Sequence, residues 1–236
     1  MARTIKIDNV LQKRFSHSKK KRKNRELKVY FLIVCEGEKT EPNYFNSFPK
    51  KVERVVYDIE CEGKGYNTMK VVEKAIELRD KSSQKYDRVW AVFDRDSFSA
   101  KNFNAAISKA KSNGINCAWS NEAFELWYLL HFQYRNTEMN RNEYKKAIEN
   151  AVNEQKKATK KPFEYAKNAT DMYVVLQQYG SQEQAILRAK KLLQQFEGQQ
   201  YADYNPATTV QNLVEELIGK SSELNEEIKG KFESGK

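Results

Sequence analysis

The chain has 236 residues and a formal net charge of +10, with 39% hydrophobic and 12% aromatic residues. This length and composition fit a soluble globular protein with one large domain, or a domain with an appended subdomain. No apolar stretch is long enough to span a membrane, and no signal-peptide core follows the basic N-terminus, so no membrane association is expected. Three cysteines, none in a Cys-x-x-Cys pair, predict buried free thiols in a reducing cytoplasm and argue against a structural zinc site.

The positive charge is concentrated at the N-terminus. Eleven of the 42 Lys and Arg residues lie within residues 1–28, alongside only Asp8 and Glu26, whereas the rest of the chain is nearly neutral. Such an arm is typical of nucleic-acid contact, because each neutralised phosphate releases a counterion. A solvated tail or a nuclear-localisation sequence would have a similar composition. We expect residues 1–27 to form a disordered basic arm that binds nucleic acid through Lys19, Lys20, Lys21, Arg22, Lys23 and Arg25.

Strand and helix patterns alternate in the segment that follows the arm. Short apolar runs bounded by polar residues predict strands buried on both faces, and the segments between them have helical periodicity. This alternation implies βαβ units and therefore an α/β fold with a parallel, doubly wound sheet. The expected strands are 28–36, 55–61, 87–94 and 115–119, and the expected helices are 40–50, with Thr40 as its N-cap, 67–80 and 100–111.

After residue 120 the pattern is one of helices only. We expect an α/β core over residues 28–132 and an all-helical C-terminal region over residues 133–236, in which the polar chain beyond residue 220 frays. The expected helices are 122–131, 141–158, 163–178, 181–196 and 206–218.

Two of the predicted strands end in acidic residues. The first continues into Glu36-Gly37-Glu38-Lys39-Thr40-Glu41, and the third into Asp94-Arg95-Asp96. Ligands of open α/β sheets bind beyond the carboxyl ends of the strands, and carboxylates gathered there repel each other unless a cation joins them. Mg²⁺ prefers hard oxygen ligands and often bridges carboxylates and phosphates. The pattern favours a Mg²⁺ (or Mn²⁺) site of Glu36, Asp94 and Asp96, although aspartates also occur in ordinary strand-end turns.

Two further residues could belong to this site. Glu125 is surrounded by apolar residues in segment 123–130. A buried carboxylate is costly unless it is paired or bound to a cation, so we expect Glu125 to complete the site; the alternative is the exposed side of an amphipathic helix. Lys39 follows the first acidic cluster and could offset charge on a phosphate, and a solvated surface lysine is an equally good interpretation.

A strand that ends in Glu-Gly, followed by a later strand that ends in Asp-x-Asp, resembles the Toprim domain of topoisomerases, primases and OLD-type nucleases. The longer motifs look like the RloB family: 31–41, 92–96, Ser120-Asn121 with 124–127, and Asn205-Pro206 with Thr208-Thr209. The resemblance implies a Toprim-like sheet, Glu36 as an acid/base or metal ligand, and Mg²⁺ on Asp94 and Asp96. RloB-like proteins are bacterial or archaeal and are often encoded near anti-phage genes, so a partner protein in defence is implied as well.

The length and the cysteine content of the chain exclude two of the activities found among Toprim proteins. It is too short for the separate strand-passage domain of a topoisomerase, and three cysteines do not supply the zinc module of a primase. A small Toprim protein with a basic arm fits a Mg²⁺-dependent nuclease acting on RNA or DNA. Its catalytic residues would be Glu36, Asp94, Asp96, Glu125 and Lys39. The alternative is a non-catalytic subunit of a defence complex that binds or senses nucleic acid.

Overall fold

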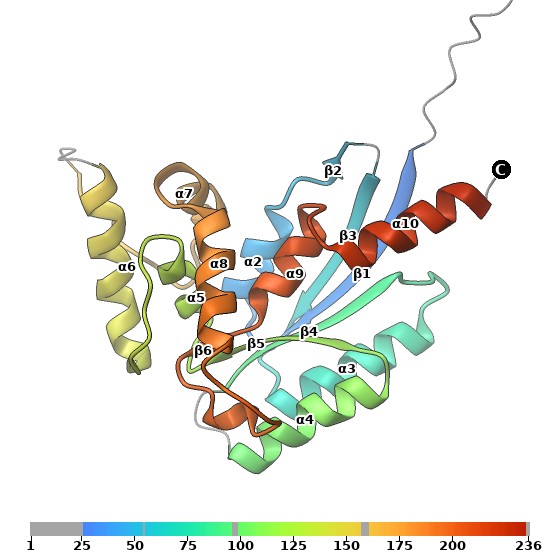
Figure 1. The fold of residues 1–236 in the computed structure, drawn as a ribbon, viewed down its shortest axis with the longest axis horizontal. Coiled ribbons are helices and arrows are strands. Elements are labelled where there is room, and N and C mark those ends of the chain that lie inside the picture. The colour runs from blue at the N-terminus through green and yellow to red at the C-terminus, as the bar shows by residue number, and fades with distance from the viewer. Residues whose placement is uncertain (1–25, 54, 96–98, 157–160, 235–236) are drawn as a thin grey trace, which may run out of the picture.

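A computed structural model describes residues 26–53, 55–95, 99–156 and 161–234 of the chain (Figure 1). The expected basic arm, apart from its last two residues, and Asp96 lie outside the described residues. None of the described helices is long and apolar enough to cross a membrane.

The centre of the fold is a six-stranded sheet with the strand order β2-β3-β1-β4-β5-β6. The four inner strands are parallel, and the short outer strands β2 and β6 run antiparallel to their neighbours. The α/β fold with a mostly parallel sheet is therefore confirmed. The strands are β1 (Leu27–Cys35), β2 (Lys51–Val52), β3 (Val55–Gly63), β4 (Arg88–Asp94), β5 (Asn116–Asn121) and β6 (Ala207–Thr208).

Helices cover both faces of the sheet, which explains why β1 and β4 are continuously apolar. Helices α3 (Thr68–Lys81) and α4 (Ala100–Ser112) pack on one face, where they bury Leu32 and Val34 of β1. The alternate residues of β1 face the opposite side and join a larger cluster. That cluster includes buried residues of α2 (Thr40–Asn46), α5 (Glu125–Leu130), α6 (Arg141–Lys156), α7 (Met172–Tyr179), α8 (Gln182–Leu193), α9 (Val210–Leu217) and α10 (Ser222–Ser234).

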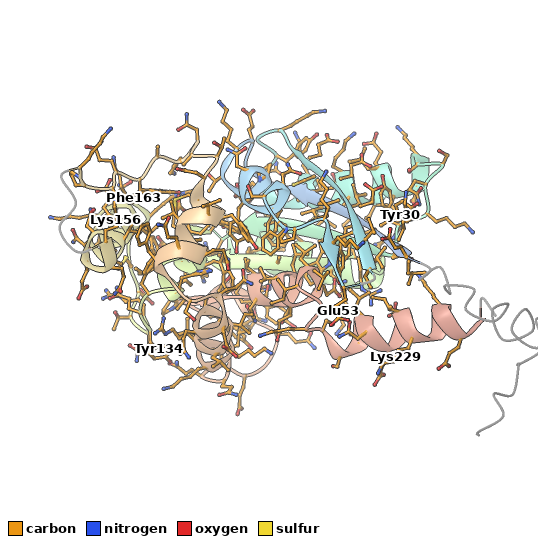
Figure 2. All side chains as sticks on the ribbon, turned by 90° about the horizontal axis from the view of Figure 1, so that it is seen from above. Tyr30, Glu53, Tyr134, Lys156, Phe163 and Lys229 are labelled. Atoms are coloured by element: carbon orange, nitrogen blue, oxygen red, sulfur yellow. The ribbon has the colours of Figure 1, made fainter. Side chains whose placement is uncertain are left out.

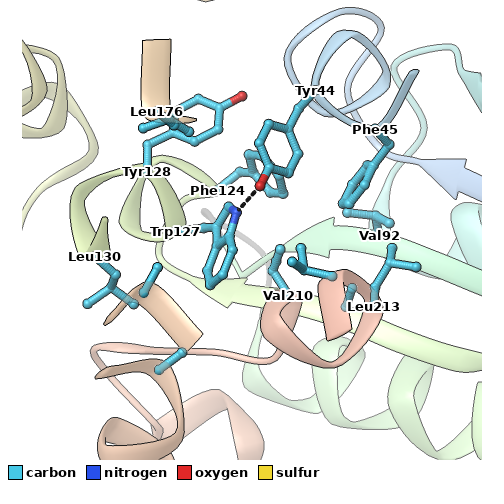
Figure 3. Packing of buried hydrophobic residues seen from close by; sticks show 14 of the residues in the cluster. Tyr44, Phe45, Val92, Phe124, Trp127, Tyr128, Leu130, Leu176, Val210 and Leu213 are labelled. Carbon is cyan, nitrogen blue, oxygen red and sulfur yellow. Dashed lines mark hydrogen bonds between the residues drawn. The ribbon is translucent and has the colours of Figure 1, made fainter. Parts of the chain in front are cut away.

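A cluster of buried aromatic residues joins α5 to α2 (Figure 3). The indole N–H of Trp127 on α5 donates a hydrogen bond of 2.8 Å to the Tyr44 hydroxyl on α2. The Tyr44 ring also lies edge-on to Phe45 and Phe124, with centroids 5.2 and 5.7 Å apart. Helices α2 and α5 are therefore held by one core.

The C-terminal region differs from the expectation in two places. It is mainly helical, but Ala207 and Thr208 form β6 and pair with β5, where only the start of a helix was expected. Within the described residues, the chain beyond residue 220 does not fray. It forms α10, because Leu224 and Ile228 are buried and Glu227 makes a two-pronged ion pair, 2.8 Å on each side, with Arg88.

A helix was expected over residues 163–178, but the observed helix is shorter and spans only Met172–Tyr179. In the residues before α7, backbone N–H groups donate to side chains of α6 and not to carbonyls of a helix of their own. The Phe163 N–H donates to Asn153 Oδ1 at 2.7 Å, and the Tyr165 N–H donates to Glu149 Oε1 at 3.0 Å. Residues 161–171 therefore form an irregular segment after α6. Figure 2 shows its residue Phe163 beside Lys156, at the end of the molecule opposite Tyr30.

Candidate acidic site at the carboxyl edge of the sheet

Glu36 and Asp94 lie side by side at the carboxyl ends of β1 and β4. These strands are parallel neighbours with Cys35 paired to Val92, and the Glu36 N–H extends the ladder by donating to the Val92 carbonyl at 2.8 Å. The Asp94 N–H donates to Glu36 Oε2 at 3.2 Å. Asp94 is buried, and Glu36 is half-buried. The expected juxtaposition of the two strand ends is therefore present.

Glu41 is a third acid of the site, although no role was predicted for it. It lies in the first turn of α2 and is only 5% exposed. Its carboxylate packs directly on Gly37, where a Cβ would lie 2.3 Å from Glu41 Oε2. Gly37 is thus needed for close approach, not only for a turn. One indication of this contact is present in the sequence. Gly37 lies between Glu36 and Glu41 and leaves room for Glu41 to fold back toward the strand end.

Glu125 is the fourth acid, at the start of α5. Its side chain is buried, and Oε1 accepts a hydrogen bond of 3.0 Å from the Tyr165 hydroxyl. The charge of Glu125 also raises the pKa of Glu41 and of Asp94, so it lies near both. Glu125 therefore belongs to the acidic cluster and not to an exposed helix side.

Burial and mutual repulsion strongly affect the carboxylates of this cluster. Burial is the main cause that raises the pKa of Glu41 to about 7, and the charge of Glu125 adds to it. The pKa of Asp94 is raised well above its usual value, first by burial and then by the charges of Glu41, Glu125 and Glu36. Ionised carboxylates are thus unfavourable here unless positive charge accompanies them.

Two cations from the C-terminal region face the cluster. Arg141, the first residue of α6, places Nη2 3.6 Å from Asp94 Oδ2, and it lowers the pKa of both Asp94 and Glu41. Lys167 also lowers the pKa of Glu41. Its carbonyl accepts a hydrogen bond of 2.7 Å from the Thr40 hydroxyl. Thr40 was expected to be the N-cap of α2, but this expectation is wrong. Thr40 is the first residue of the helix, and the N-cap is Lys39.

The other predicted site residues can be placed only in part. Lys39 lies just before α2 with an exposed side chain, and its carbonyl accepts the N–H of Asn43 at 2.8 Å. Asp96 and the cluster of Lys19, Lys20, Lys21, Arg22, Lys23 and Arg25 lie outside the described residues.

The donor set suits a hard divalent cation by its chemistry. Four carboxylates lie close together, and carboxylate oxygens are the ligands that Mg²⁺ and Mn²⁺ prefer. Within the described residues, no group of three Asp, Glu, His or Cys side chains has the geometry to hold a metal ion as it stands. Metal binding would therefore require side-chain rearrangement or the participation of residues beyond those described.

The fold and the site together define an α/β protein with an acidic cluster at the carboxyl edge of a mostly parallel sheet. Residues 31–217 match the family described as RloB-like protein, which covers most of the chain and includes every residue of the acidic cluster. The chain thus belongs to the RloB-like protein family. Neither a curated protein nor a solved structure gives a significant match.

Proposed function

We propose that the chain is a metal-dependent nuclease of the Toprim class that hydrolyses phosphodiester bonds in RNA or DNA. The observation that carries the proposal is the convergence of Glu36, Glu41, Asp94 and Glu125 at one sheet edge, with three of the four carboxylates buried. Such crowding costs stability in the absence of a cation, and it is a common feature of sites that use divalent metals. The resemblance to the Toprim domain supports the same chemistry.

The residues can be given roles from their positions. After rearrangement of their side chains, Glu36, Glu41 and Asp94 would hold Mg²⁺ or Mn²⁺, with Asp96, two residues after Asp94, as a further candidate ligand. When bound, the metal would orient the attacking water and stabilise the leaving oxygen. Glu36 is the half-exposed member of the cluster, so its carboxylate can also reach a solvent water and accept its proton. Glu125 is fixed by the Tyr165 hydroxyl and would set the charge around the other acids.

The test is a titration of Mg²⁺ or Mn²⁺ into the protein in the presence of labelled RNA and DNA. A nuclease shortens the substrate only when metal is present, and Asp94→Asn removes this activity. Asp58→Asn is the matched control, because Asp58 is an exposed aspartate within β3. Retardation of intact substrate, without cleavage under any metal condition, would instead favour a nucleic-acid-binding subunit. The basic arm, with most of the excess charge of the chain, is the feature that favours this second function.

We propose that the setting is prokaryotic anti-phage defence, with a partner protein of the same system. Membership of the RloB-like family supports this setting. Loss of protection against phage in cells that carry Asp94→Asn, at unchanged protein level, is the expected result.

A further inference from the structure

Cys35 and Cys61 form a pair of free thiols beside the strand end that carries Glu36. Their sulfur atoms lie 3.6 Å apart, and neither cysteine belongs to a disulfide. Cys35 is the last residue of β1 and immediately precedes Glu36, whereas Cys61 lies on the neighbouring parallel strand β3. The register pairs Cys35 with Gly63, which has no side chain to separate the two thiols. Neither cysteine has a role in the proposed function.

The two thiols differ in their access to solvent. Cys35 is fully buried in the main core, whereas Cys61 is only partly buried. Strand β2 pairs with Val55 and Val56, at the opposite end of β3, so the described part of the chain has no strand on the outer side of Cys61. A small oxidant therefore reaches Cys61 from the edge of the sheet before it reaches Cys35.

We propose that Cys35 and Cys61 are a reversible oxidation site, at which a hydroperoxide converts the two thiols into a disulfide. With hydrogen peroxide, the Cys61 sulfur attacks the O–O bond, which gives a sulfenic acid on Cys61 and one water. The Cys35 sulfur then attacks the Cys61 sulfur, and the hydroxyl group leaves with the Cys35 proton as a second water. Two electrons thus pass from the thiols to the peroxide, and a reducing dithiol reverses the reaction by exchange. This inference goes beyond the proposed nuclease function and does not depend on it.

The disulfide would act on the turn that follows β1. An S–S bond is about 2.05 Å long, so its formation draws the ends of β1 and β3 toward each other. The strand ends are already in close contact beside the pair, since a Cβ on Gly63 would lie 2.0 Å from the Gly37 carbonyl oxygen. The Tyr66 N–H, after β3, also donates to the Glu36 carbonyl at 3.1 Å. Because this contact leaves no room for compression, we expect the disulfide to displace segment 36–41.

The experiment treats the full chain with hydrogen peroxide and maps its disulfides by mass spectrometry of unreduced peptides. The expected product is a pair of peptides joined through Cys35 and Cys61, which dithiothreitol returns to free thiols. Cys61→Ser should abolish this product. Cys117→Ser is the matched control and should form the same bridge as the parent, because Cys117 lies on β5 and packs against the cluster on the opposite face of the sheet.

Hydrogen–deuterium exchange of the backbone amides in segment 36–41 measures the effect on the acidic cluster. Oxidation should change the exchange rates there several-fold in the parent and in Cys117→Ser, but not in Cys61→Ser; Cys61→Ala takes its place if the serine variant does not fold. Oxidation of Cys61 without a bridge to Cys35, or no oxidation of either thiol in the folded parent, would overturn the proposal. A bridge that leaves the exchange of segment 36–41 unchanged would contradict its effect on the cluster.

Discussion

The backbone N–H of Asp94 donates a hydrogen bond to the carboxylate of Glu36, although the two residues are 58 positions apart in the chain. The contact exists because β1 and β4 are adjacent and parallel, so their carboxyl ends reach the same edge. The Glu36 carboxylate is oriented by the very strand that delivers Asp94. A metal that binds both residues would therefore join two strand ends that already lie together.

The first prediction concerns Asp94. Asp94→Asn keeps the shape of the side chain but removes the charge that a divalent cation needs, so metal-dependent cleavage should be abolished. Thermal stability without metal should be maintained or should rise, because repulsion with Glu41, Glu125 and Glu36 is relieved. Nuclease assays beside melting curves test both effects. Glu36→Gln should lose cleavage as well, and full activity in Asp94→Asn would rule out the proposed mechanism.

The second prediction is a pH dependence that arises from Glu41. Its pKa is raised from 4.5 to about 7 in the folded protein, so between these values the folded state binds more protons than the unfolded state. The contribution of Glu41 to the free energy of unfolding is therefore fully present below pH 4.5 and is lost as the pH rises through 7. The loss amounts to roughly 3 kcal/mol at most, from 1.36 kcal/mol per pKa unit. Asp94 acts in the same direction.

Comparison with Glu41→Gln isolates this effect. Buried His131 opposes it in the parent, since burial lowers the His131 pKa to about 4 and makes stability rise between about pH 4 and 6.5. Denaturant unfolding at a series of pH values, without divalent metal, should show that Glu41→Gln gains stability relative to the parent as the pH rises from 5 to 8. A constant difference between the two proteins over that range would contradict the raised pKa.

Part of the site could be predicted from the sequence and part could not, for identifiable reasons. Glu36 and Asp94 end apolar runs, and parallel strands bring such ends to one edge, so local pattern alone predicts their proximity. Arg141 and Tyr165 come from the C-terminal region, where helical periodicity places a residue on a helix face but not against a distant strand. Their positions follow from the packing of α6 on the core.

The 161–171 segment shows how tertiary contacts override local propensity. Its apolar spacing continues into that of α7 and predicted one helix. The Glu149 and Asn153 side chains instead accept the backbone N–H groups that a helix would have used. No pattern within residues 161–171 contains that information, since both partners belong to α6.

The third prediction concerns the two glycines at this edge. A Cβ on Gly37 would meet Glu41 Oε2 at 2.3 Å, whereas a Cβ on Gly63 would meet the backbone carbonyl of Gly37 at 2.0 Å. Gly37→Ala should displace the Glu41 carboxylate and weaken Mn²⁺ binding. Gly63→Ala should lower the free energy of unfolding by roughly 1–3 kcal/mol or more, because a backbone cannot yield as a side chain can. Calorimetry and denaturant unfolding distinguish the two effects.

Gly230→Ala is the control for these substitutions. Gly230 lies within α10 with nothing within 4 Å of an added Cβ, so alanine should be neutral or should stabilise by roughly 0.5–1 kcal/mol through helix propensity. Parental metal affinity in Gly37→Ala would show that Glu41 does not need its observed position.

The fourth prediction concerns Tyr165. Tyr165→Phe removes the hydroxyl that donates to Glu125 and leaves a buried carboxylate oxygen without that partner. The free energy of unfolding should therefore fall by roughly 1.5–3 kcal/mol. Cleavage should fall, but less than in Glu125→Gln, which removes the charge itself. Tyr86→Phe is the matched control. Tyr86 lies just before β4, and its hydroxyl donates to the exposed carboxylate of Glu60. Equal loss of stability in both variants would contradict a special role for the Tyr165 hydroxyl.

The last prediction concerns the basic arm. Residues 1–25 carry most of the excess positive charge, and β1 begins only at Leu27, so their deletion should leave the melting temperature unchanged. Nucleic-acid binding should weaken and its salt dependence should flatten, by about 0.7 to 0.9 in the slope of log K against log salt for each phosphate that the protein no longer neutralises. Anisotropy titrations from low to high salt, with full-length protein and truncated protein in parallel, measure this slope. An unchanged slope would mean that residues 26–236 bind all of the phosphates, and residues 1–25 would then have to act on a protein partner.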